Sequence, residues 1–205
     1  MLHLFPHWNW KGQEAVEITV WCHSNLERVE LFLNGKSLGS KSILKNSHVE
    51  WKVRYVPGVL EALGWQNGKM VLTARHETTG TAAKIVLRPD RLTIAADGED
   101  LSVISLELVD VEGRVVPTAC NEIRFNITGS GRLIGLGNGD PSCHEPDKPA
   151  SFNEGKRSAF NGLCMAIVQA LKQTGTIHVS ASAGGLETAS VTIQAEPAVP
   201  RRSVM

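Results

Sequence analysis

Apolar and polar residues alternate with a period of two along most of this 205-residue chain. Near the amino terminus, Ile18, Val20 and Cys22 fall on one side of an extended segment. Thr19 and Trp21 fall on the other side. Because the side chains of a β-strand point alternately to its two faces, this period predicts strands with one buried face. Such strands need a second sheet to cover their apolar side.

Asn-Gly pairs interrupt the alternation and predict where neighbouring strands turn back. Asn34-Gly35, Asn67-Gly68 and Asn161-Gly162 each fall between two predicted strands. Both residues tolerate the positive φ that a two-residue hairpin turn requires. Short strands at this spacing, with no convincing helix-length amphipathic run, predict an all-β chain of two tandem immunoglobulin-like β-sandwich domains. Only Leu163–Gln173 also admits a helix, and its flanking turns favour a strand.

The alternation also predicts which side chains face the core of each sandwich. In the first half, the predicted inward rows are Trp51, Val53 and Tyr55, and then Met70, Leu72 and Ala74. In the second half, they are Ile104, Leu106 and Leu108, then Ile123, Phe125 and Ile127, and then Leu163, Met165 and Ile167. These rows are expected to close two independent cores.

The predicted domain boundary is Arg88-Pro89-Asp90, because proline ends a strand there. The first domain is expected to span residues 1–87 and the second residues 91–195, each long enough to bury a core. Residues 196–205 are expected to form a tail. Because the chain starts inside a predicted strand and ends in a Pro/Arg-rich segment, we expect it to be a piece of a longer protein.

The stretch Gly129–Pro141 shares with a phosphate-binding loop only its clustered glycines. A phosphate cradle needs a helix that begins directly after the glycines. Here Gly139-Asp140-Pro141 predicts a turn instead. We therefore expect a core strand whose glycines allow close packing or a bulge, then a long surface loop that returns to a partner strand at Leu163–Leu171.

Composition argues against several functional classes. The 21 basic and 21 acidic residues balance, which argues against a nucleic-acid partner. No apolar run approaches the roughly 20 residues that a membrane-spanning helix needs, so no membrane span is expected. The cysteines form no CxxC pair and the histidines no closely spaced set, so no metal site and no cofactor are expected. Cys22 and Cys164 are predicted to be buried thiols, whereas a disulfide between Cys120 and Cys143 stays open.

Two segments resemble a known family. Leu4-Phe5-Pro6-His7-Trp8-Asn9-Trp10, followed by the run from Val29 to Gly39, resembles the domain after the catalytic barrel in bacterial glycoside hydrolase family 2 enzymes, chiefly β-galactosidases. The second half resembles the next carboxy-terminal domain of these enzymes. Its matching residues are Ala96-Asp97-Gly98, Leu101, Asp110–Gly113, Val116-Pro117, Asn121, Asn138-Gly139-Asp140-Pro141 and Phe160-Asn161-Gly162-Leu163.

The resemblance implies a non-catalytic role for this chain. Family 2 enzymes carry two catalytic glutamates in a (β/α)₈ barrel, and no alternating strand–helix units occur here. No catalytic residue is therefore assigned. The expected partner is the catalytic barrel of the same parent chain, which this piece would support or position in glycan hydrolysis.

All five tryptophans fall in the first half of the chain. Phe5, Trp8 and Trp10 lie where the missing barrel would join, so they are expected to form an exposed interdomain contact. Trp21 and Trp65 are the candidates for carbohydrate binding, because aromatic faces suit the C–H surfaces of sugars.

Two alternative functions stay open at this stage. The first is a carbohydrate-binding module for β-galactoside glycans, which needs exposed and roughly coplanar aromatic rings. The second is a cell-surface adhesin, although the two halves lack the internal similarity of a repeat array. The parent's substrate, its oligomeric state and its compartment are not indicated by the sequence.

Overall fold

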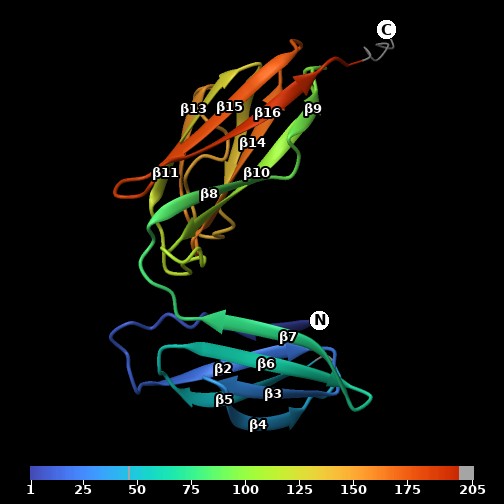
Figure 1. Ribbon diagram of the computed structural model, residues 1–205, viewed down its shortest axis with the longest axis vertical. Coiled ribbons are helices and arrows are strands. Elements are labelled where there is room, and N and C mark those ends of the chain that lie inside the picture. Colours follow the sequence, from blue (N-terminus) through green and yellow to red (C-terminus); the bar gives the residue numbers. More distant parts are fainter. Residues whose placement is uncertain (46, 199–205) are drawn as a thin grey trace. The chain divides into compact units, whose positions relative to one another are not determined.

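Figure 1 shows the computed structural model, which describes residues 1–45 and 47–198. Every regular element in these residues is a strand, which confirms the predicted all-β fold, and none could cross a membrane as a long apolar helix. The chain divides into two compact units, residues 1–79 and the residues from Gly80 onward. Residues 199–205, most of the expected tail, lie outside the described part.

The first unit is a sandwich of a three-stranded and a four-stranded antiparallel sheet. Its strands are β1 (Leu2–Phe5), β2 (Glu17–Ser24), β3 (Arg28–Leu33), β4 (Lys36–Ser42), β5 (His48–Arg54), β6 (Val59–Gln66) and β7 (Lys69–Glu77). The sheet orders are β1-β2-β5 and β4-β3-β6-β7. Asn34 and Gly35 turn β3 into β4 with φ of 50° and 77°, as predicted for a hairpin.

The core of the first unit follows the predicted alternation, with one exception. Trp51, Val53 and Tyr55 are buried, whereas Met70 and Leu72 are 49% and 39% exposed. The prediction that both face inward was wrong. The register between β6 and β7 shifts by one residue at this point, which interrupts the alternation, and β7 is an edge strand with a neighbour on one side only.

The second unit is a sandwich of a four-stranded and a five-stranded sheet. Its strands are β8 (Lys84–Pro89), β9 (Thr93–Ala95), β10 (Leu101–Val109), β11 (Glu122–Gly129), β12 (Gly131–Gly137), β13 (Glu154–Ser158), β14 (Leu163–Ala170), β15 (Gly175–Ser182) and β16 (Ala189–Glu196). The sheet orders are β12-β14-β10-β8 and β13-β11-β15-β16-β9. Only the β9–β16 pair among these is parallel.

Strand β8 corrects the predicted domain boundary. The segment up to residue 87 was expected to close the first domain, but the strand that forms there, Lys84–Pro89, pairs with β10 in the second unit. Ile85 lies in the second core and is 5% exposed. Pro89 is the last residue of this edge strand, so the sheet loses no backbone hydrogen bond through the missing N–H of proline. The boundary falls at Thr79 and Gly80 instead.

Strand β14 also faces the opposite way from the predicted row. Its buried residues are Cys164, Ala166, Val168 and Ala170, whereas Leu163 is 44% exposed. Both faces of this segment are apolar, so the period of two does not indicate which face turns to the core. The prediction of a strand rather than a helix was correct, and the predicted buried thiol at Cys164 is confirmed.

The glycine-rich stretch forms β12, which pairs antiparallel with β14 as predicted. The register shifts between Leu133 and Gly135, which marks the expected irregularity. A Cβ atom built on Gly131 would lie 2.7 Å from the side chain of Ile177, so the glycine allows close packing across the two sheets. The long loop that follows β12 leads to β13.

A buried carboxylate ties down the beginning of the second unit. The side chain of Asp110 is fully buried and accepts hydrogen bonds from the backbone N–H groups of Gly80 (2.9 Å), Glu112 (3.0 Å) and Arg114 (2.9 Å). The guanidinium of Arg114 donates to the same carboxylate at 2.7 Å and 2.9 Å. Burial raises the pKa of Asp110, but the bonds from Arg114 and Gly80 outweigh it and hold the pKa well below its usual value.

We expect Asp110→Asn to lower the free energy of unfolding of the second unit by about 1–3 kcal/mol at pH 7, because buried donors lose a charged acceptor. The folded-state pKa lies below the unfolded value, so the carboxylate's contribution is present above about pH 4 and is lost as the pH falls further. Hydrogen exchange of the core amides of β10, compared at pH 7 and in acid, measures both effects.

The matched control is Glu112→Gln, whose carboxylate is 64% exposed and pairs with Arg114. This change should leave the exchange of the β10 amides within about 0.5 kcal/mol of the parent chain. An equal loss in both variants, or an Asp110→Asn defect that persists undiminished in acid, would contradict the assignment.

Candidate functional site

The outer surface of the β1-β2-β5 sheet carries a row of aromatic rings. We call it the aromatic face, and it consists of His3, Phe5, Trp21, His23 and His48. The strand register brings these residues together, because His3 is paired with His23, Phe5 with Trp21, and His23 with His48. Sequence positions from three separate strands therefore meet on one surface.

The rings of the aromatic face lie against one another. Phe5 stacks on His23 with centroids 5.5 Å apart, and its edge meets Trp21 at 5.3 Å. Trp21 stacks on His48 with centroids 4.9 Å apart and planes 22° from parallel. Such geometries are favourable for aromatic pairs. Trp21 is nevertheless 36% exposed, so the rings form an ordered aromatic surface that still contacts solvent.

Charged and polar residues mark one end of the aromatic face. Further along the same side of β2 and β5, the Lys52 ammonium donates a hydrogen bond to the Thr19 hydroxyl at 2.6 Å. Glu17, Glu50 and Arg54 are exposed on this side. Charged residues therefore border the aromatic face on β2 and β5, with Glu50 directly opposite Trp21. Exposed hydrophobic rings rimmed by polar residues are typical of interaction sites.

Trp8 does not belong to this surface, which corrects its expected role in an exposed contact. Its side chain is fully buried, its indole N–H donates to the carbonyl oxygen of Val56 at 3.0 Å, and its ring meets Tyr55 edge-on at 5.2 Å. Leu4, the residue before Phe5 on β1, is also buried. Strand β1 ends at Phe5, before Pro6, so the face alternation of a strand does not continue to Trp8.

Trp10 is partly buried and held within the same loop. Its indole N–H donates to the carbonyl oxygen of His7 at 3.0 Å, and the two rings stack at 4.8 Å. The neighbouring side chain of Asn9 donates to the Thr79 hydroxyl at 2.7 Å and accepts from the Thr79 N–H at 3.0 Å. Burial lowers the pKa of His7, and the nearby His76 lowers it further. This loop fixes the last residue of the first unit.

Trp65 lies on the other sheet, away from the aromatic face. It is paired with Arg28 across β3 and β6, and the guanidinium of Arg28 lies 4.4 Å from its ring centroid. This cation–π contact covers one face of the indole. The indole N–H is buried and has no hydrogen-bond partner among the described residues. The structure thus does not bring the two carbohydrate-binding candidates, Trp21 and Trp65, together.

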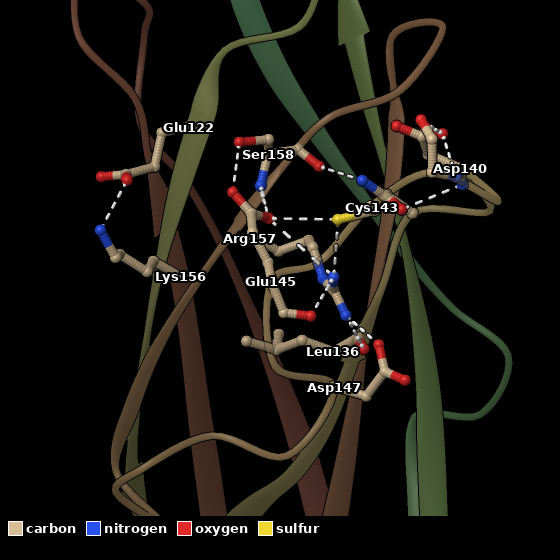
Figure 2. A network of polar contacts seen from close by, with 11 residues as sticks. Glu122, Leu136, Asp140, Cys143, Glu145, Asp147, Lys156, Arg157 and Ser158 are labelled. Atoms are coloured by element: carbon tan, nitrogen blue, oxygen red, sulfur yellow. Dashed lines mark hydrogen bonds and ion pairs between the residues drawn. The ribbon is translucent and has the colours of Figure 1, made fainter.

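In the second unit, a buried arginine holds the long loop after β12, as Figure 2 shows. The guanidinium of Arg157, 1% exposed, forms an ion pair with Asp147 and donates to the carbonyl oxygens of Leu136 (2.8 Å) and Glu145 (3.0 Å). It also contacts the sulfur of Cys143 at 3.1 Å. One side chain thereby fastens three points of the loop and the end of β12.

The carboxylate of Glu145 extends this network to β13 (Figure 2). It accepts hydrogen bonds from the hydroxyl of Ser158 at 2.6 Å and from its N–H at 2.8 Å, and these bonds lower the pKa of Glu145. Sequence reasoning missed the network. The available signal was the alternation of β13, which places Arg157 on the same inward side as Gly155 and Ala159. A buried cation needs anionic partners, and two carboxylates lie in the preceding loop.

The remaining sequence predictions concern cysteines and metals. All four cysteines are free, with Cys22 and Cys164 buried and Cys120 exposed, so the structure holds no disulfide between Cys120 and Cys143. Burial raises the pKa of Cys22 to about 11. Among the described residues, no group of three or more His, Cys, Asp or Glu side chains is placed to hold a metal ion.

The fold defines the chain as a tandem of β-sandwiches, and comparison with protein families identifies it further. Residues 85–192 match the family described as glycoside hydrolase family 2 C-terminal domain 5. Residues 15–72 match a domain of unknown function (DUF4982). The chain therefore belongs to glycoside hydrolase family 2, as its resemblance to these enzymes indicated.

Curated relatives are much longer than this chain. It is 40% identical over 199 residues to beta-galactosidase BoGH2A of Bacteroides ovatus, a match that covers 96% of the chain and 22% of that protein. It is 29% identical over 202 residues to a beta-glucuronidase of Formosa agariphila, with 96% of the chain and 20% of that protein covered. The chain thus spans about a fifth of the length of these relatives.

Solved structures show the same relation. A glycosyl hydrolase family 2 member from Bacteroides cellulosilyticus matches with a TM-score of 0.82 and 39% identity, over 93% of this chain and 24% of that one. A beta-glycosidase from Bacteroides vulgatus matches with a TM-score of 0.85 and 30% identity, over 94% of this chain and 24% of that one. Both support the sandwich fold across nearly the whole chain.

The burial of Trp8 gives a direct prediction. Trp8→Ala should lower the free energy of unfolding of the first unit by about 3–5 kcal/mol, because it removes a large buried ring and its bond to Val56. All five tryptophans lie within residues 1–79, so urea denaturation followed by tryptophan fluorescence reports on this unit alone.

Trp21→Ala is the matched control, since it removes the same ring from the exposed aromatic face. It should cost less than about 1.5 kcal/mol in the same measurement, because only ring contacts at the surface are lost. Equal losses in the two variants would show that Trp8 is not the anchor of its loop.

Proposed function

We propose that this chain is a non-catalytic, carboxy-terminal part of a β-galactosidase-like glycosidase, and that it supports or positions the catalytic barrel. The observation that carries the proposal is the family match at residues 85–192, which is to a C-terminal domain of glycoside hydrolase family 2. The relatives' extra length leaves room for a barrel outside these residues. The reaction would then take place on carboxylates that this chain does not supply.

The substrate class follows from the relatives. Two are named beta-galactosidases and two are named as beta-glucuronidases, so the proposed parent enzyme hydrolyses β-glycosides. The higher identity to the beta-galactosidase, 40% against 29% for the Formosa agariphila beta-glucuronidase that matches over a similar length, favours a β-galactoside. Identity in these accessory residues bears on common descent, and the barrel would select the sugar.

The aromatic face is the surface we assign to contact with the barrel. Phe5, expected to make this contact, and Trp21, expected to bind carbohydrate, lie 5.3 Å apart on it. Aromatic residues are enriched at protein interfaces, and rings already packed together lose little conformational freedom on docking. Burying such a patch against the barrel would link the stability of this chain to that of the catalytic part. Trp8 and Trp10 would contribute indirectly, by holding the loop next to β1.

Sugar stacking on Trp21 is the competing function for this surface. A sugar ring needs an open indole face. Trp21 has one face stacked on His48, and the ring of Phe5 lies against it at 65°, so its neighbours reduce the area left for a sugar. The part of the Trp21 ring that stays exposed suits contacts with side chains of a protein interface better than stacking of a flat sugar ring. For this reason we rank the barrel contact above carbohydrate binding here.

We expect the purified 205-residue chain to show no hydrolysis of aryl β-galactosides above a buffer control, while the full-length enzyme that contains it turns them over. The physical reason is that a pair of catalytic carboxylates must flank the glycosidic bond, and we place that pair in the barrel. The measurement is release of the aryl group at matched molar concentrations. Turnover by the chain alone, abolished by substitution of one of its own carboxylates, would refute the proposal.

A further inference from the structure

The second unit contains a pocket of about 420 Å³ on the side of the sandwich closed by the long loop. Its walls come from that loop, from β11 and β13, and from the end of β12. Phe125 and Leu136, both almost fully buried, lie at its base, and Pro146 and Pro149 contribute apolar surface from the loop. The volume falls in the range of small-molecule sites.

The base of this pocket depends on a glycine. A Cβ atom built on Gly155 would lie 2.8 Å from Leu136, 2.9 Å from Leu133 and 3.2 Å from Pro149. The backbone of β13 therefore lies directly against the apolar side chains beneath the loop. A side chain at this position would occupy space next to the pocket.

The wall formed by the loop is held in place before any ligand arrives. Asp147, between the pocket residues Pro146 and Lys148, is ion-paired with the buried Arg157, as Figure 2 shows. Its carbonyl oxygen also accepts the N–H of Leu136 at 2.8 Å. A pocket that is largely formed in the free protein loses less entropy on binding than one that must close.

Cations dominate the rim of the pocket. Arg124 and Lys156 are directly opposite each other on β11 and β13, where like charges repel, and both share the carboxylate of Glu122 at 3.3 Å and 2.8 Å. Lys148 lines the loop side and has no hydrogen bond or ion pair with any described residue. Arg124 and Lys156 thus share one carboxylate, and Lys148 is left without an ionic partner among the described residues.

Glu154 adds an acceptor to the same rim. It lines the pocket, and its side chain, like that of Lys148, has no hydrogen bond or ion pair with any described residue. A carboxylate without a partner can accept hydrogen bonds from hydroxyl groups. The pocket therefore combines an apolar base, an unpaired cation and a free hydroxyl acceptor. A ligand that satisfies all three has an apolar ring surface, hydroxyl groups and a negative charge.

We propose that this pocket binds an acidic sugar unit, a pyranose that carries a carboxylate or a sulfate. The C–H face of the ring would lie on the apolar base, the anionic group would bind Lys148 and the Arg124–Lys156 pair, and Glu154 would accept from ring hydroxyls. The choice of a sugar over other anionic ring compounds rests on the proposed function in a glycosidase. The pocket would then hold a charged glycan apart from the catalytic barrel.

The test is a titration of the ¹⁵N-labelled 205-residue chain with methyl β-D-glucuronide, with galactose 6-sulfate and with neutral methyl β-D-galactoside, followed by amide NMR. We expect both acidic sugars to shift the amides of Lys148 and Gly155 with dissociation constants at least about tenfold below that of the neutral sugar. Lys148→Gln should weaken acidic-sugar binding about tenfold, and Glu154→Gln should weaken it less.

Lys69→Gln, an exposed lysine on β7 of the first unit, is the matched control and should change nothing. Equal binding of neutral and acidic sugars, no effect of Lys148→Gln, or inorganic sulfate binding as tightly as the sulfated sugar would overturn the proposal. Because the titration needs no catalytic barrel, such a failure would leave the proposed supporting role untouched. Conversely, hydrolysis by the chain alone would not alter the titration.

Discussion

Each sheet in this chain must cover one face with a second sheet, because its strands alternate buried and exposed side chains. The strands cover their apolar faces through the register in which they pair. The irregular segments have no such pairing, and individual side chains must hold them in place. Three buried side chains do so. Trp8 anchors the loop after β1, Asp110 anchors the start of the second unit, and Arg157 anchors the loop after β12.

The parts of the fold that depend on local chemistry were predictable from the sequence. Asn34-Gly35 could be assigned to a hairpin because few residue pairs accept positive φ twice in succession. The row Trp51, Val53, Tyr55 was assigned correctly because its alternate positions are charged. The glycine-rich stretch was assigned to a strand because no helix could begin at its turn residues.

The errors have physical causes that a single sequence does not display. Met70 is exposed because a register shift at the edge of the sheet interrupts the alternation. The outward direction of Leu163 could not be predicted, because residues on both faces of its strand are apolar. Arg157 was missed because a buried cation is stable only with partners, and these lie ten and more residues away in an irregular loop.

The residues of the aromatic face are far apart in the sequence and lie together in the structure. Phe5 was assigned to the barrel contact and Trp21 to carbohydrate binding. They are 16 positions apart, and the pairing of β1 with β2 brings them opposite each other. The histidines of this face had no motif, because they come from three strands. Strand register is a long-range property, so such a face cannot be read from local spacing.

The central claim is that the aromatic face is covered by another part of a longer glycosidase. Hydroxyl-radical footprinting of the full-length enzyme and of the 205-residue chain tests it most directly. The account predicts that Trp21 and Phe5 are oxidised readily in the isolated chain and are protected several-fold in the full-length enzyme, while Met70 on the opposite sheet reacts equally in both. Equal oxidation of Trp21 in the two proteins would contradict it.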